Sequence, residues 1–283
     1  MLNTVRYWHI HLLLACFSIF LISALFHKRK RLLALQTELT FAGIIVAAAF
    51  VQSLLWDNWG THLGFWVFNP DKTSALDLLG NHLPLEEVLW IVHHALIAIF
   101  CQALVFDLLP SRSATPTPRH YPPIVIVGVY LLLGLISLYG VYAILLSHHS
   151  HLQISGLVAL FFGPVFILQW FLGYPFLRPH HLPLSLGTLI PSLYTFAADS
   201  LAQSLGIWRF SPNYTLQFQF FGLQPDVFSI YFATTLACTL TYTIVRAILD
   251  THPLAIKTIA NSPPIANRPR VQDILVRVFI TRL

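Results

Sequence analysis

The chain has 283 residues, of which 56% are hydrophobic and only 10% are charged. Soluble domains carry about 25% charged residues, so this composition excludes a sizeable soluble domain and predicts an integral membrane protein. The net charge of +5 does not indicate nucleic-acid binding, because the basic residues flank apolar segments instead of forming one face. Cys16, Cys101 and Cys238 each fall inside an apolar segment, which favours small apolar side chains over a disulfide or a zinc site.

Seven apolar segments follow one another along the chain, each near the roughly 20 residues that a spanning helix needs. The first ends in the basic run 27–31, which is typical of a stop-transfer sequence and not of a cleaved signal peptide. The sequence therefore predicts an all-α, polytopic membrane protein of about seven transmembrane helices. We expect them at about 8–26, 39–56, 84–108, 123–147, 154–177, 183–201 and 226–249.

The basic residues also predict the orientation of the chain. With the N-terminus outside, the inner loops and tail hold thirteen Lys and Arg residues, whereas the outer side holds only Arg6, Lys72 and Arg209. Because basic residues concentrate on the cytoplasmic side, we expect a multi-pass protein of the inner (cytoplasmic) membrane with a cytoplasmic C-terminus. The segment 57–83 then forms an outer loop. The basic tail, 250–283, ends in a segment that suits a helix on the membrane surface or a disordered end.

An internal repeat is indicated by five identities at a constant offset of 142 residues. Asp57, Gly64, Trp66, Phe68 and Pro70 recur as the same residue types at 199, 206, 208, 210 and 212. Three helices plus a linker helix return the chain to its starting side, so both copies have the same orientation, and repeat proteins of this kind commonly place their site at the repeat interface. We expect a first repeat at 1–108, a Pro-rich linker with the fourth helix at 109–149, and a second, degenerate repeat at 150–249.

The motif Pro84-Leu85-Glu86-Glu87 stands at the start of the third predicted helix. Proline suits a first helical turn, and glutamates there face the positive end of the helix dipole, so the motif is compatible with a simple helix start. Carboxylates at a membrane edge are also functional candidates. In the second copy, after a three-residue shortening, Asp226 matches Glu87 and a proline stands at the position of Glu86.

These residues resemble the lycopene cyclase domain of the heterodimeric and fused carotenoid cyclases. That family pairs three-helix units marked by an upstream Asp, a Gly-x-Trp-x-aromatic stretch and a Pro-x-Glu-Glu motif, which match Asp57, residues 64–68 and residues 84–87. The resemblance implies that Glu86 and Glu87 are the catalytic acid and base, with no flavin or nicotinamide. The chain departs from the pattern in its second motif and in Phe68 and Phe210, where tyrosine is common.

Cyclisation of a linear polyene needs an acid that protonates an alkene, a surface that holds the cation, and a base. A carboxyl group removed from water favours its neutral form. We predict Glu86 as the acid, because Trp90 and His93 share its helix face, with Glu87, Asp57 and Asp226 as further catalytic candidates. Aromatic faces stabilise cations. The candidate substrate-binding set is Trp59, Trp66, Phe68, Trp90, His93, Asp199 and Trp208.

Several alternatives remain open at this point. Fourteen histidines allow a metal enzyme, but the clusters 148–151 and 180–181 fall on opposite sides of the membrane in the predicted topology. A transporter or isoprenoid-binding protein without chemistry suits a parallel repeat. Capture of the cation by water makes a hydratase, and a shorter substrate makes a terpene cyclase.

We expect no metal and no cofactor, since ring closure is an isomerisation and the chain lacks a dinucleotide-binding Gly motif. The expected partners are a hydrophobic isoprenoid or carotenoid substrate and the lipid bilayer, but no nucleic acid. A homo- or hetero-oligomer is left open.

Overall fold

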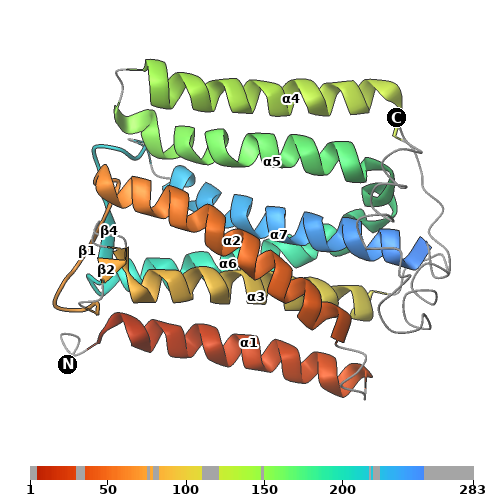
Figure 1. Cartoon of the computed structure of the whole chain (residues 1–283), viewed down its shortest axis with the longest axis horizontal. Coiled ribbons are helices and arrows are strands. Elements are labelled where there is room, and N and C mark those ends of the chain that lie inside the picture. The colour runs from red at the N-terminus through yellow and green to blue at the C-terminus, as the bar shows by residue number, and fades with distance from the viewer. Residues whose placement is uncertain are drawn as a thin grey trace, which may run out of the picture.

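The computed structural model describes residues 5–29, 36–74, 77–78, 83–109, 121–147, 150–216, 218 and 224–251. Most of the predicted linker, the tail beyond residue 251 and the pair His148–His149 lie outside these described residues. The protein is an all-α polytopic membrane protein whose long helices lie side by side, with short strands gathered at one end of the bundle (Figure 1). Its helices are α1 (Tyr7–Arg29), α2 (Gln36–His62), α3 (Leu85–Leu108), α4 (Pro123–Val141), α5 (Gln153–Leu177), α6 (His181–Ser204) and α7 (Pro225–Thr251).

The predicted apolar segments agree with these helices within a few residues, except at the end of α2. This helix continues to His62 and includes Asp57 and Trp59, so the prediction that an outer loop begins at Asp57 was wrong. The chain leaves the helix only where Gly64 adopts a positive φ of 74°, a backbone conformation that glycine tolerates without a steric penalty. Asp57 is therefore held on a helix and not on a loop.

Six continuous helical segments of the described chain are long and apolar enough to cross a membrane. The longest, Ser150–Ser204, contains both α5 and α6, which meet at a 3₁₀ turn, Arg178–His180. The two helices run in opposite directions and lie in different layers of the bundle (Figure 1), so the segment represents two helices rather than one. This accounts for the difference between six segments and the seven predicted helices.

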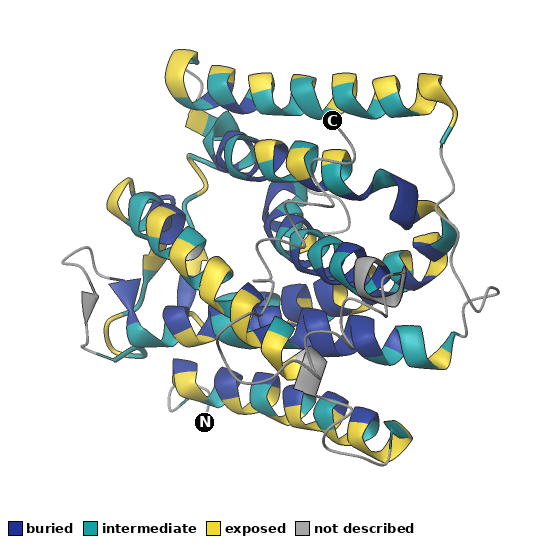
Figure 2. Ribbon diagram, turned by 45° about the vertical axis from the view of Figure 1, so that its right-hand side comes forward, coloured by how far each residue is buried: buried dark blue, intermediate teal, exposed yellow. Residues whose placement is uncertain are grey.

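Helix α3 is the centre of the bundle and packs against α1, α2, α6 and α7. Most of its residues are buried, whereas α4 lies at the edge and is made of exposed and half-buried residues, with only Gly140 buried (Figure 2). Helix α4 packs mainly against α5. The contact is close because a Cβ added at Gly140 would lie 2.4 Å from the backbone of Leu160, as expected where small residues let membrane helices approach. Apolar side chains on the outer faces suit a surface in contact with lipid.

Two short antiparallel strands, β1 (Trp66–Phe68) and β4 (Trp208–Phe210), join the two halves of the chain. Trp66 pairs with Phe210, and Phe68 pairs with Trp208, so the register is unchanged when the strands are exchanged. A smaller pair, β2 (Asp77–Leu78) and β3 (Leu83–Pro84), precedes α3. These strands were not predicted, because each has only two or three residues and shows no alternating pattern.

Candidate functional site

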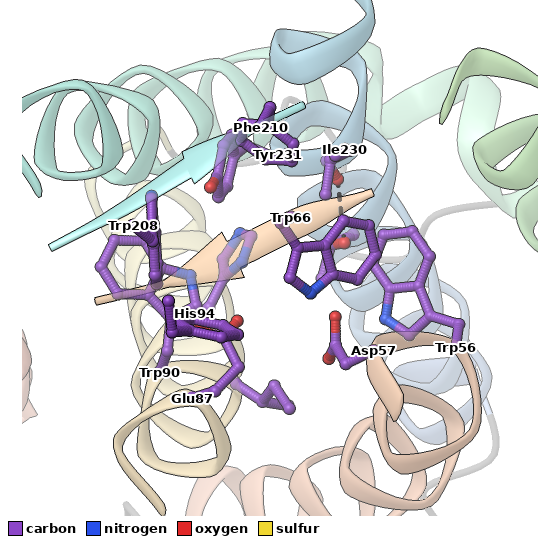
Figure 3. A pocket seen from close by; sticks show the side chains of 13 residues that line it. Trp56, Asp57, Trp66, Glu87, Trp90, His94, Trp208, Phe210, Ile230 and Tyr231 are labelled. Atoms are coloured by element: carbon purple, nitrogen blue, oxygen red, sulfur yellow. Dashed lines mark hydrogen bonds between the residues drawn. The ribbon is translucent and has the colours of Figure 1, made fainter. Parts of the chain in front are cut away.

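An aromatic cavity lies beneath the β1–β4 pair, between α2, α3 and α7 (Figure 3). It contains about 560 Å³ of free space, including the part that is open to the outside. Its aromatic lining comes from both halves of the chain: Trp56, Trp66, Phe68, Trp90, Trp208, Phe210 and Tyr231. The remaining described lining residues are Asp57, Glu87, Ile91, His94, Ile230 and Thr234, so the wall contains two carboxyl groups and no Lys or Arg.

Glu87 supplies one of these carboxyl groups from the first turn of α3. Its side chain is only 8% exposed, and its Oε2 accepts a hydrogen bond of 2.7 Å from the hydroxyl of Tyr7. Tyr7 is completely buried and begins α1, where its backbone N–H donates to the carbonyl of Lys72. The acid is therefore held by a neutral donor that is itself fixed by the loop before α3.

Two tryptophans complete the surroundings of Glu87. The ring of Trp208 lies 4.8 Å from that of Tyr7 and 5.1 Å from that of Trp90, in both cases edge to face. The Trp208 Nε1 donates to Asp199 Oδ1 at 2.8 Å. Asp199 is fully buried behind this ring, and the side-chain amide of Gln203 donates to its Oδ2 at 2.6 Å. Asp199 thus fixes the orientation of Trp208 in the cavity wall.

Asp57 supplies the second carboxyl group of the cavity wall, from α2. It is 6% exposed, and it lies across the free space from Glu87, with Trp66 next to it (Figure 3). A carboxyl on each side of one apolar cavity provides two separate positions where a bound molecule can gain or lose a proton.

Two other predicted acids hold loops and do not line the cavity. Both carboxyl oxygens of Glu86 accept hydrogen bonds from Ser74. The backbone N–H donates to Oε1 at 2.7 Å, and the hydroxyl donates to Oε2 at 2.5 Å. Asp226 accepts from the backbone N–H of Leu216 at 2.9 Å. In both cases a carboxylate in the first turn of a helix fixes the loop that leads to it. The geometry therefore favours Glu87 over Glu86 as the acid that faces the cavity.

The remaining predicted residues also fall into two groups, those that line the cavity and those that do not. Trp66, Phe68, Trp90 and Trp208 line the cavity, whereas Trp59 contacts Phe161 outside it, with 6.3 Å between ring centroids. His93 does not line the cavity, and its ring lies 5.7 Å from that of His11. No group of three or more His, Cys, Asp or Glu side chains among the described residues is arranged to hold a metal ion.

Sequence reasoning did not predict several residues of the site, of which Tyr7, Trp56 and Tyr231 matter most to the argument. Tyr7 precedes the first predicted helix, Trp56 is adjacent to Asp57, and Tyr231 lies five residues after Asp226 on α7. Trp56 and Tyr231 were detectable only by their proximity to acidic residues. For Tyr7, no signal in the sequence predicts a contact with a residue 80 positions away.

The fold and the cavity define a polytopic membrane protein with an acidic, aromatic site. A lycopene beta-cyclase from Halobacterium salinarum is 28% identical over 193 residues, which cover 68% of this chain and 76% of that protein. A bifunctional lycopene cyclase/phytoene synthase from Aspergillus niger is 26% identical over 187 residues, 64% of this chain but 30% of that protein. A protein of the same description from Podospora anserina is 25% identical over 204 residues, 68% of this chain and 32% of that protein.

The chain is therefore similar to lycopene cyclases of archaea and fungi. It spans about a third of the length of the bifunctional relatives. No family model matches the chain, and no solved structure gives a match.

Proposed function

We propose that this protein is a membrane isoprenoid cyclase that closes an end ring of a linear carotenoid, most simply of lycopene. The observation that carries the proposal is the position of Glu87, a buried carboxyl held by a neutral tyrosine and facing an aromatic cavity. The relatives named lycopene beta-cyclase support the substrate class. The reaction is redox-neutral, so we propose that no cofactor takes part.

We propose Glu87 as the acid. Tyr7 donates to its Oε2, which leaves Oε1 to carry the acidic proton and to present it to an alkene. Transfer of this proton forms a C–H bond at one alkene carbon and leaves a tertiary cation at the other. The electrons of a nearby double bond then form the C–C bond that closes the ring. We assign Glu86 to the support of the loop at Ser74 and not to proton transfer.

We propose Asp57 as the base. It removes a proton from a ring carbon next to the cation, and the electrons of that C–H bond form the ring alkene. The faces of Trp66, Trp90 and Trp208 stabilise the cation in the meantime, at about 0.5–2 kcal/mol for each ring.

We also propose the predicted domain organisation: repeats at 1–108 and 150–249, joined by the linker and α4, with a basic tail from 250. The bias of Lys and Arg supports a cytoplasmic membrane location with the N-terminus outside. In this orientation the cavity lies near the outer surface. The reciprocal pairing of β1 with β4 supports two copies related by an axis along the membrane normal.

Expression of the chain in a host that accumulates lycopene tests the function directly. We expect pigments of the same mass as lycopene that contain one or two end rings. A product heavier by one water would instead indicate a hydratase, and unchanged lycopene in cells that contain the protein in their membranes would contradict the proposal.

A further inference from the structure

The two halves of the chain make the same contacts in both directions at the strand pair. The N–H of Asn69 donates to the carbonyl of Ile207, and the N–H of Ser211 donates to the carbonyl of Phe65, both at 2.8 Å. The two donors, 69 and 211, differ by 142, and so do the two acceptors, 65 and 207. The same offset that relates the sequence identities therefore relates these two hydrogen bonds. Gly64 and Gly206 share a positive φ. These contacts identify which residues occupy equivalent places in the two halves.

Equivalent contacts then extend the comparison to the helices. The N–H of Tyr7 donates to the carbonyl of Lys72, and the N–H of Ile154 donates to the carbonyl of Tyr214, which is 142 residues further on. Ile154 therefore occupies the place of Tyr7. The same comparison can be made for the loops that lead into α3 and α7. In the first half, the N–H of Ser74 donates to the carboxylate of Glu86.

The N–H of Leu216, again 142 residues on, donates to Asp226. Asp226 thus corresponds by contact to Glu86, and the following residue, Val227, corresponds to Glu87. This pairing differs by one residue from the alignment of Asp226 with Glu87 that the sequence suggested.

The place of the acid in the second half is therefore apolar. Where the first half buries the pair Tyr7 and Glu87, the second half buries Ile154 and Val227, at 0% and 2% exposure. Neither side chain can donate a proton. The other described carboxyl of the cavity wall, Asp57, faces the same free space as Glu87 and so serves the same bound chain end.

We infer that this chain has one ring-closing centre and acts on one end of a linear polyene in each binding event, releasing the molecule between the two ends. The inference rests on the proposed function. The cavity is lined by residues of both halves, so the two halves together form one site that holds Glu87 and Asp57. Each closure also consumes the proton of Glu87, so a second closure requires that Glu87 regain a proton and that the other end take the place of the first.

A labelling experiment tests the inference with the full chain in liposomes. Isotope-labelled lycopene is supplied in large molar excess over the protein, together with an equal amount of unlabelled monocyclic carotenoid. We expect labelled monocyclic pigment to exceed the amount of protein before labelled bicyclic pigment appears, and the bicyclic pigment formed at early times to come almost entirely from the unlabelled monocyclic carotenoid. A product that remains monocyclic also supports the inference.

Bicyclic pigment that forms from the first turnover with undiluted label would overturn the inference, because both ends would then react within one visit, at a second acid or in a second copy of the chain. Failure of lycopene to form any ring would instead overturn the proposed function, and the inference with it.

The variant Asp226→Asn provides a second measurement. If the second half supplies no catalytic acid, the ratio of monocyclic to bicyclic pigment, compared at equal conversion of lycopene, is the same as in the wild-type protein. A product restricted to one ring would overturn the inference, because Asp226 would then be needed for the second end.

Discussion

The two halves of the molecule share a backbone plan but differ in the side chains beside the cavity. In the first half, α1 and α3 bury a tyrosine and a glutamate that are hydrogen-bonded to each other. In the second half, α5 and α7 bury an isoleucine and a valine at the equivalent places. Because β1 and β4 make the same backbone contacts in both directions, the halves differ here in their side chains and not in their backbone. A shared scaffold can therefore position a site while only one half supplies its acid.

The largest expected effect comes from Glu87→Gln. Glutamine preserves the size of the side chain and can accept from Tyr7, but it has no acidic proton, so we expect cyclisation to fall at least about 100-fold. The ratio of cyclic to linear pigment in lycopene-producing cells measures this. The neighbouring variant Glu86→Gln is the matched control and is expected to lose less than about tenfold. Equal losses in both variants would contradict the distinction between cavity acid and loop tether.

A smaller loss is expected for Tyr7→Phe. This change removes the only hydrogen bond to Glu87 that the described residues show, and such a bond contributes about 0.5–1.5 kcal/mol, which corresponds to roughly a 2–10-fold lower rate. Ile154→Val, at the equivalent place in the second half, is the control and should keep the wild-type rate. Initial rates with purified protein in liposomes make the measurement, and a rate unchanged by Tyr7→Phe would argue against a role for this hydrogen bond.

The carboxylates of Glu86 and Asp226, which each hold the loop before a helix, should contribute similarly to stability. Glu86→Ala and Asp226→Ala each remove a carboxylate that accepts from a loop N–H, so we expect each to lower the free energy of unfolding by about 1 kcal/mol. Thermal unfolding in detergent measures the change. A much larger loss of stability in one variant would indicate that the two loops are not equivalent.

Effects of similar size, on stability alone, are expected for Gly64→Ala and Gly206→Ala. Both residues have a positive φ, 74° and 64°, and an L-residue there costs about 1 kcal/mol or slightly more. Because nothing lies within 4 Å of an added Cβ at Gly64, backbone strain alone sets the cost. Gly43→Ala, inside α2 with open space around it, is the control and should be neutral or stabilising. Thermal unfolding would also show whether the two turns differ.

Much of the fold could be predicted from the sequence, because membrane spans leave a strong and local signal of length and apolarity. The end of α2 could not, since Asp57, Asn58 and Trp59 are polar or amphipathic residues that continue a helix beyond its apolar segment. The carboxylate pair was found from its sequence motif, and four of the predicted aromatic residues line the cavity. The choice between Glu86 and Glu87 depends on contacts with Ser74 and Tyr7, which belong to other segments of the chain.

The central claim is that an exchangeable proton passes from Glu87 to the end of a polyene. The most direct test is cyclisation of lycopene by the purified chain in deuterium oxide, followed by mass spectrometry of the pigment. Proton transfer from the carboxyl predicts one deuterium atom for each ring closed, and no labelled ring from the Glu87→Gln variant. Rings formed without deuterium by the wild-type protein, or labelled rings formed at the normal rate by the variant, would contradict the account.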